Sequence, residues 1–165
     1  MKHLKKFEAF HYSNLHRPNL IKIKVDELRD FCETYLAYLM DDAIKELKVG
    51  NPQLLQTDKY VCYNVEIYFN KSVHWDQIKV HFLPFLQMVQ KEYVFREDNI
   101  GRVSSIDWRI EDTLTTIPKQ YTLKQLLDDK IETNFTFKLA SDRKASIQGN
   151  VGSIKLEILE EVEKS

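Results

Sequence analysis

The sequence predicts an α+β domain: a mixed or mainly antiparallel sheet with two long helices and one short helix packed on one face. Three observations support this. Several segments alternate apolar and polar residues, several strand patterns are joined as hairpins by turn residues, and the helical patterns are concentrated in the first half of the chain. The 165 residues are 43% hydrophobic and 30% charged, as in an ordinary folded domain. We expect a basic N-terminal arm over residues 1–19 and one domain over 20–165.

The first elements are a short strand and a long helix. Residues 20–25 alternate apolar side chains with lysines, which predicts a strand leading to a helix N-cap at Asp26. Apolar residues then recur every three or four positions from 27 to about 48, which predicts one long amphipathic helix. The turn residues 50–52 should end it.

The second strand and the second long helix follow. Residues 59–70 alternate strictly, with apolar side chains on one face. Ser72 can cap a helix that runs to about residue 92 with a stripe of large apolar residues. Pro84 lies inside that pattern, so we expect a kink or a break between Val80 and Pro84.

The second half of the chain is mostly strand. Residues 93–97 and 102–111 flank the turn-forming residues 98–101, which predicts a hairpin, and Pro118 should close the segment that follows. Thr122 and Gln125 have the spacing of a capping box, before a short helix that ends at Asp128 and Asp129. Further strands are expected over 131–139 and 153–162, and the segment between them can add one at 145–148.

One exposed strand surface is a candidate interaction site. Tyr60 and Tyr68 lie on the polar face of the 59–70 strand, and four polar residues alternate with apolar ones in the 102–111 strand: Ser105, Asp107, Arg109 and Glu111. Paired carboxylates there suit acid–base chemistry, but alternating charges are also the usual means of keeping a sheet surface soluble. We favour the interpretation that these charges form a solvated surface over the acid–base interpretation, and we regard this surface as a candidate for protein contact.

Other candidate sites carry weaker patterns. His74, Gln77 and His81 would form a polar row on an unbroken helix, but a zinc site needs more converging ligands, so we predict no metal. No pair of glycines precedes a helix as a phosphate loop requires, and we predict no cofactor. Cys32 and Cys62 lie in apolar segments and are predicted to be buried free thiols.

Charge bears on the choice of partner. The chain has 24 basic and 25 acidic residues, a net charge of −1, so nucleic acid is a less favoured partner than another protein or a second copy of the chain. The local exception is the N-terminal arm, where Lys2, Lys5, Lys6 and Arg17 could act as an electrostatic arm. No segment has the apolar length of a membrane span and the start has no signal-peptide core, so we expect a cytoplasmic protein.

The opening residues MKHLKKFEAF resemble the leaders of uncharacterised proteins encoded by large tailed bacteriophages. The resemblance implies a phage or phage-like source and carries over no active site. Our leading hypothesis is a non-catalytic protein-interaction or assembly protein. One alternative is a small-ligand or nucleic-acid binding module that uses the basic arm. The other is an enzyme of unrecognised class that uses His74, His81 or the surface from Asp107 to Glu111.

Overall fold

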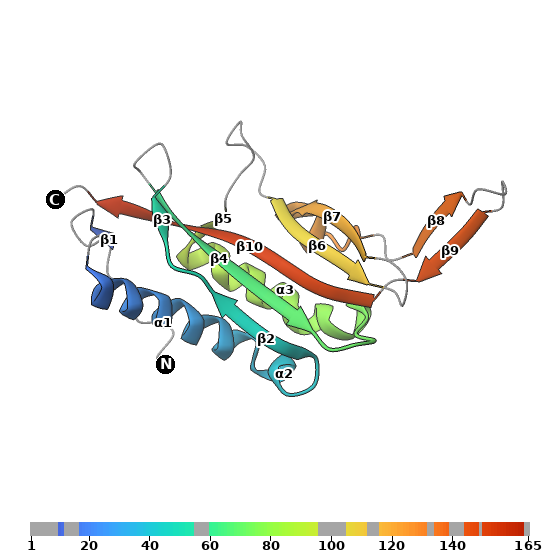
Figure 1. Ribbon diagram of the computed structural model, residues 1–165, viewed down its shortest axis with the longest axis horizontal. Coiled ribbons are helices and arrows are strands. Elements are labelled where there is room, and N and C mark those ends of the chain that lie inside the picture. The colour runs from blue at the N-terminus through green and yellow to red at the C-terminus, as the bar shows by residue number, and fades with distance from the viewer. Residues whose placement is uncertain are drawn as a thin grey trace.

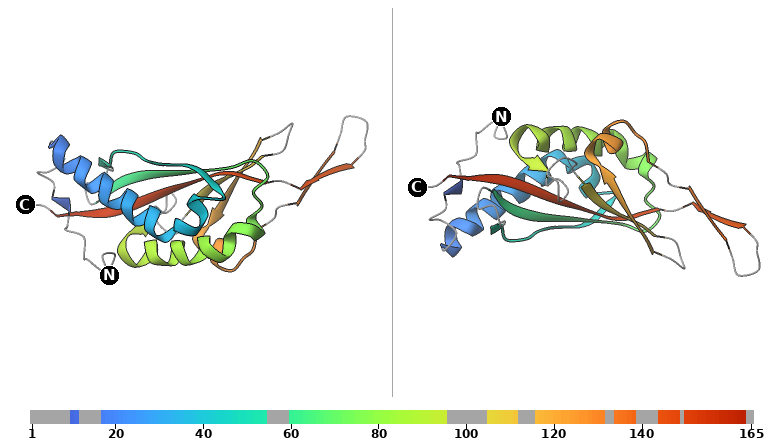
Figure 2. Two further views of the ribbon diagram at one scale, coloured as in Figure 1. Left: turned by 90° about the horizontal axis from the view of Figure 1, so that it is seen from below. Right: turned by 90° about the horizontal axis from the view of Figure 1, so that it is seen from above.

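The computed structural model describes residues 10–11, 17–54, 60–95, 105–111, 116–131, 134–138, 144–148 and 150–163. These residues form an open, mainly antiparallel sheet with the helices packed on one face, which confirms the predicted α+β class (Figures 1 and 2). Figure 1 looks onto the other face, with α3 behind the strands. None of the helices in the described part of the chain is long and apolar enough to cross a bilayer.

The main sheet is built around its last strand, which pairs along both edges. Its path is β2-β4-β10-β6-β7, antiparallel at every step, and three short strands attach to it. The strands are β1 (Phe10–His11), β2 (Ile44–Val49), β3 (Gln53–Leu54), β4 (Tyr60–Phe69), β5 (Val94–Phe95), β6 (Ser105–Glu111), β7 (Thr116–Thr122) and β10 (Asn150–Glu163).

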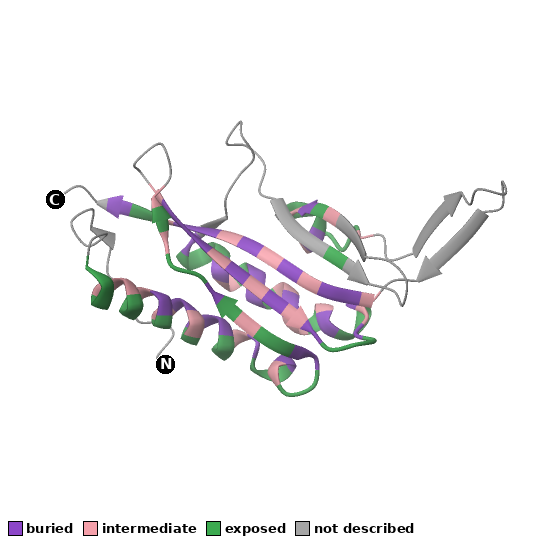
Figure 3. Cartoon of the chain, in the orientation of Figure 1, coloured by how far each residue is buried: buried purple, intermediate pink, exposed green. Residues whose placement is uncertain are grey.

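Strands β4 and β10 were predicted correctly, and burial alternates over residues 63–69 of β4 and 152–158 of β10 (Figure 3). Val61, Val65 and Ile67 on β4 are fully buried. Each of them lies opposite a residue of β10, and antiparallel partners share a face of the sheet. These two strands therefore supply the centre of the core beneath the helices.

The first helix begins earlier than predicted. α1 spans Pro18–Tyr35, so the predicted strand over 20–25 is wrong. Pro18 suits the first turn of a helix because its missing N–H has no intrahelical acceptor there. The buried residues Val25, Leu28 and Cys32 follow at helical spacing and anchor α1 to the core.

The first helix also ends earlier than predicted. A short helix α2 (Ala37–Met40) follows α1, and the chain then forms β2, so the prediction of helix to residue 48 is wrong. Ile44 and Val49 pair with Phe69 and Val65 of β4 and are buried. The apolar spacing of this stretch fits a helix as well as a strand, and pairing with β4 decides between them.

The second long helix, α3 (Trp75–Glu92), is one element. The predicted apolar stripe is buried, including Phe82, Phe85 and Leu86 on both sides of Pro84, so a break at Pro84 does not occur. The predicted cap at Ser72 is wrong, since Ser72 adopts a φ of 68° in the preceding turn and His74 caps the helix.

The predicted hairpin between residues 93–97 and 102–111 does not form. β5 and β6 both pair antiparallel with β10. β5 lies opposite Leu159 and Ile158, and β6 lies opposite residues 150–155, so the two strands follow one another along one edge of β10. Pro118 does not close the segment either. It lies inside β7, which is an edge strand of the described sheet. Proline is tolerated there because the N–H that it lacks would have faced the unpaired side of the strand.

The remaining predictions agree with the structure. Thr122 and Gln125 form the expected capping box of α4 (Leu123–Leu127). β8 (Asn134–Lys138) and β9 (Lys144–Gln148) occur close to the predicted strands, and they pair with each other in a separate two-stranded sheet. In Figure 1 this hairpin extends past the end of the main sheet.

Candidate functional site: the open face of the sheet

The face of the sheet opposite the helices carries polar and charged residues from four strands. We call it the open face. Sheet register defines its members, because directly opposed residues of antiparallel strands share a face. They are Glu46 and Lys48 on β2, Asn64, Glu66 and Tyr68 on β4, Ser153, Lys155 and Glu157 on β10, and Arg109 on β6.

Charges of opposite sign alternate across this face. Lys48 lies opposite Glu66, and Glu66 lies opposite Lys155. On the other side of β10, Lys155 pairs with Asp107 of β6, and Asp107 pairs in turn with Gln120 of β7. Neighbouring opposite charges stabilise adjacent strands of a sheet.

A second row places an aromatic side chain beside these charges. Tyr68 lies opposite Glu46 on one side and Ser153 on the other, and Ser153 pairs with Arg109. The Tyr68 hydroxyl donates a hydrogen bond of 2.7 Å to Glu66 Oε2, and Lys48 Nζ lies 5.4 Å from the centre of its ring. Tyr68 is thus held in place by residues from two strands.

The charges around Tyr68 act on its ionisation. Its hydrogen bond to Glu66 raises the pKa of the hydroxyl above its ordinary value, and the positive charge of Arg109 opposes that shift. Tyr68 therefore presents a neutral hydroxyl at physiological pH. Tyr68 and Arg109 are far apart in the sequence, and Ser153 of β10 lies between them in one row of the sheet.

The structure brings together part of the predicted interaction surface. Tyr68 and Arg109 lie in one row of the open face, and Arg109 is exposed. Tyr60 lies at the start of β4, opposite Glu161. Ser105, Asp107 and Glu111 lie in β6 as predicted, but their side chains are outside the described residues.

Sequence reasoning missed the β2 contribution to this face. Glu46 and Lys48 were assigned to a helix, and the polar–apolar alternation of Glu46-Leu47-Lys48-Val49 is the signal that could have identified a strand. A hollow of about 390 Å³ lies beside this strand. Its walls are Arg29, Leu47, Lys48, Val49, Gly50, Asn64 and Glu66.

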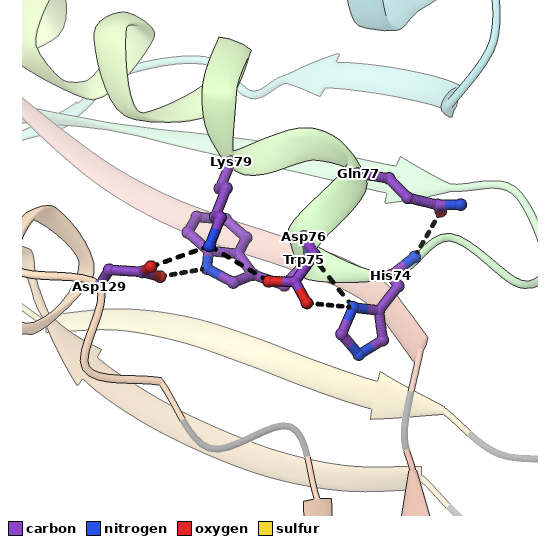
Figure 4. A network of polar contacts seen from close by, with 6 residues as sticks. All are labelled: His74, Trp75, Asp76, Gln77, Lys79 and Asp129. Carbon is purple, nitrogen blue, oxygen red and sulfur yellow. Dashed lines mark hydrogen bonds and ion pairs between the residues drawn. The ribbon is translucent and has the colours of Figure 1, made fainter.

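The predicted polar row on α3 does not form one site. His74 Nδ1 accepts a hydrogen bond from the Asp76 amide, and Gln77 Oε1 accepts one of 2.9 Å from the His74 amide, which makes these residues the helix cap (Figure 4). His81 instead stacks on the exposed ring of Tyr38, with ring centres 5.1 Å apart. His74 and His81 therefore serve different local contacts, and of the residues named for the enzyme hypothesis only the surface from Asp107 to Glu111 is left as a single group.

The same end of α3 is tied to the turn after α4. Asp129 accepts hydrogen bonds from Trp75 Nε1 at 3.0 Å and from Lys79 Nζ at 2.9 Å (Figure 4). These two bonds hold the pKa of the Asp129 carboxyl below its usual value. Asp129 has a φ of 56°, a left-handed conformation in the turn just after the end of α4. We interpret this network as a structural link between the helices.

A half-buried polar cluster lies between α1 and the sheet. Glu160 of β10 accepts a hydrogen bond of 2.9 Å from the Tyr63 hydroxyl and forms an ion pair of 2.8 Å with Lys24 of α1. The Lys24 and Glu160 side chains are only 13% and 12% exposed. Burial, and then the charge of Glu160, raise the pKa values of Tyr63 and Tyr93 far above that of a free tyrosine.

Both cysteines are free and buried, as predicted. Burial raises the pKa of Cys32 to about 12, so its thiol stays protonated and is a poor nucleophile at neutral pH. Within the described ranges, no three His, Cys, Asp or Glu side chains are grouped as metal ligands. Lys2, Lys5 and Lys6 lie outside the described residues, and Arg17 is exposed at the N-cap of α1.

Comparison of the chain with protein-family models, with curated proteins and with solved structures finds no significant match. The arrangement of residues is therefore the basis for the functional argument below.

Proposed function

We propose that this chain is a non-catalytic protein-interaction or assembly protein that docks a partner protein on the open face of its sheet. One observation carries the proposal: a sheet face that no helix of the described residues covers, on which Tyr68 is held between Glu66 and Lys48 in the same row as Arg109. Tyrosine and arginine are enriched among the residues that contribute most to protein–protein affinity. Holding Tyr68 in place before binding lowers the entropy lost on association.

The charge of the open face favours a protein partner over nucleic acid. Lys48, Lys155 and Arg109 are matched by the acidic residues Glu46, Glu66 and Glu157. Nucleic acid binds surfaces with an excess of positive charge, because the phosphates dominate its affinity. A surface of alternating sign instead selects a partner whose own charges have the complementary pattern.

The setting of this interaction is part of the proposal. We place it in the cytoplasm, where free thiols such as Cys32 and Cys62 stay reduced. The resemblance of the first ten residues to phage protein leaders supports a tailed-phage source. A partner encoded by the same genome or by its host is then expected.

Site-specific photo-crosslinking tests the docking role. A photoreactive amino acid at Lys155, in the centre of the open face, should give one adduct of defined mass in cells that naturally contain the protein. The same group at Gln87, exposed on α3 in the helix layer, is the matched control and should give none. With the captured partner purified, Tyr68→Ala should weaken binding by about tenfold or more.

Two results would contradict this role. One is the absence of a defined adduct from position 155. The other is an adduct whose yield is equal from position 87 and is unchanged by Arg109→Glu. Circular dichroism of each variant checks that the fold is retained.

A further inference from the structure

Strand β2 is an edge of the main sheet with backbone groups available for pairing. It pairs with β4 on one side, and no strand in the described part of the chain pairs with its other side. The Gly50 amide donates to the Asn64 carbonyl, which sets the phase of the antiparallel ladder. Because bonded pairs alternate along such a ladder, Lys48 and Glu46 bond to β4, and the backbone groups of Leu47 and Val49 point to the open edge.

The surroundings of β2 leave space for another strand. The hollow of about 390 Å³ borders the edge at Leu47, Val49 and Gly50, and Arg29 of α1 also lines it. The opposite edge of the sheet differs, because β7 contains Pro118, which has no N–H to offer to a neighbour. Of the two edges, β2 is the one suited to accept a strand along its backbone.

We infer that an extended segment of a partner protein adds to β2 as an antiparallel strand, with a basic residue opposite Glu46 and an acidic residue opposite Lys48. This rests on the proposed docking role and specifies the partner's chemistry. Antiparallel addition continues the pattern of the existing sheet and is slightly more stable per residue than parallel pairing. A residue opposite Leu47 would exchange both backbone hydrogen bonds with it.

The side chains of the edge provide the selectivity. Glu46 and Lys48 are exposed, have opposite charge and lie on the same face, 3.7 Å apart at their charged atoms. Charges on an edge strand usually prevent unspecific pairing, because most incoming strands bring an unmatched charge. Here they would admit a segment with the reverse order of charges and exclude the others. The β-bulge between Ile44 and Glu46 limits regular pairing to the second half of the strand.

A synthetic peptide with the sequence of β2 itself, IKELKV, is a suitable probe. When it lies antiparallel with its leucine opposite Leu47, its lysine faces Glu46 and its glutamate faces Lys48. The matched control is IKKLEV, which has the same composition but places like charges opposite each other. We expect the control peptide to bind about tenfold more weakly, because two favourable cross-strand pairs become repulsive.

Nuclear magnetic resonance titration of the labelled protein measures the affinity of each peptide and identifies the residues that it contacts. IKELKV should shift the amide signals of Leu47 and Val49, whereas the amide of Gly50, already bonded to Asn64, should change less. The double variant Glu46→Lys/Lys48→Glu should reverse the preference and bind IKKLEV more tightly. Sedimentation of the protein alone reports whether a second copy occupies the edge.

The inference is overturned if neither peptide binds, if both bind equally, if the shifts map away from β2, or if the edge is already closed by a second copy. The peptide assay needs no cellular partner, so the two proposals fail separately. A defined adduct from position 155 without peptide binding would overturn only strand addition. Peptide binding without that adduct would overturn only docking on the open face.

Discussion

Glu160 occupies a position on β10 where the neighbouring residues of the same face are apolar. Ile158 on one side is fully buried and Val162 on the other is 6% exposed. The carboxylate is accommodated because Lys24 and the Tyr63 hydroxyl satisfy its two oxygens. Removing one member of such a cluster leaves a buried charge without compensation, which costs more than the intact pair contributes.

Lys24→Met should therefore lower the free energy of unfolding by about 3 kcal/mol in urea denaturation at pH 7. The double variant Lys24→Met/Glu160→Gln should recover much of that loss, because the amide is uncharged and its oxygen can still accept from Tyr63. Arg29→Met, which removes an exposed pair with Asp26, is the control and should cost less than about 1 kcal/mol. If the losses caused by Lys24→Met and Glu160→Gln simply added up in the double variant, the two side chains would not be energetically coupled.

The same cluster predicts how stability depends on alkaline pH. Folding raises the pKa of Tyr63 above the free value of 10.0, so its contribution is complete below about pH 10 and is lost as the pH rises toward the folded value. Above pH 10 the free energy of unfolding should fall with pH, and the fall should be less steep in Tyr63→Phe. Tyr38→Phe, at an exposed position, should keep the wild-type slope. Equal slopes in all three proteins would contradict the argument.

At the scale of elements, α3 shows how packing overrides a local preference. Proline inside a helix removes one backbone hydrogen bond and crowds the preceding turn. Pro84 is nevertheless tolerated because it lies on the exposed side of the helix, while Phe82 and Phe85 are fully buried against the core. The apolar stripe holds the helix together across the weak point.

Pro84→Ala should stabilise the protein by about 1–2 kcal/mol. The new N–H can donate to the carbonyl one turn earlier, and part of this gain is offset by the greater freedom of the unfolded chain. Gln87→Ala, exposed one turn further along, is the control and should change stability by less than about 0.5 kcal/mol. Thermal unfolding measures both, and a destabilised Pro84→Ala variant would mean that the proline geometry is itself needed for packing.

At the scale of the whole molecule, β10 links the parts of the main sheet, and β8 and β9 form a sheet of their own. β10 pairs with β4, β6, β5 and β1, whereas β8 pairs only with β9 among the described strands. We therefore expect the hairpin to be separable from the main domain.

Replacing residues 135–147 by Asn-Gly should leave the main domain folded. Asn134 and Gln148 are paired, so a two-residue turn can join them without moving α4 or β10. The melting temperature should change by no more than about 4 °C, corresponding to less than about 1 kcal/mol. Ile154→Ala, which opens a cavity under β10, should cost about 3 kcal/mol and is the comparison. Loss of the folded state on shortening the hairpin would show that it supports the main core.

The sequence by itself determined the elements whose patterns are strong and local. The strict sequence alternation of β4, the partial alternation of β10, the buried stripe of α3 and the capping box of Thr122 and Gln125 are all encoded within about one element's length. The free, buried state of both cysteines followed from their apolar neighbours. These features needed no knowledge of distant partners.

Tertiary structure decided the rest. Residues 44–49 fit two periodicities and become a strand only because β4 pairs with them, and β5 and β6 lie in line only because β10 offers one edge to both. The open face has the same origin, since Tyr68 and Arg109 share a row only because each pairs with Ser153 of a third strand. Strand pairing is a contact between segments far apart in the chain, so a local pattern can indicate a strand but cannot select its neighbours.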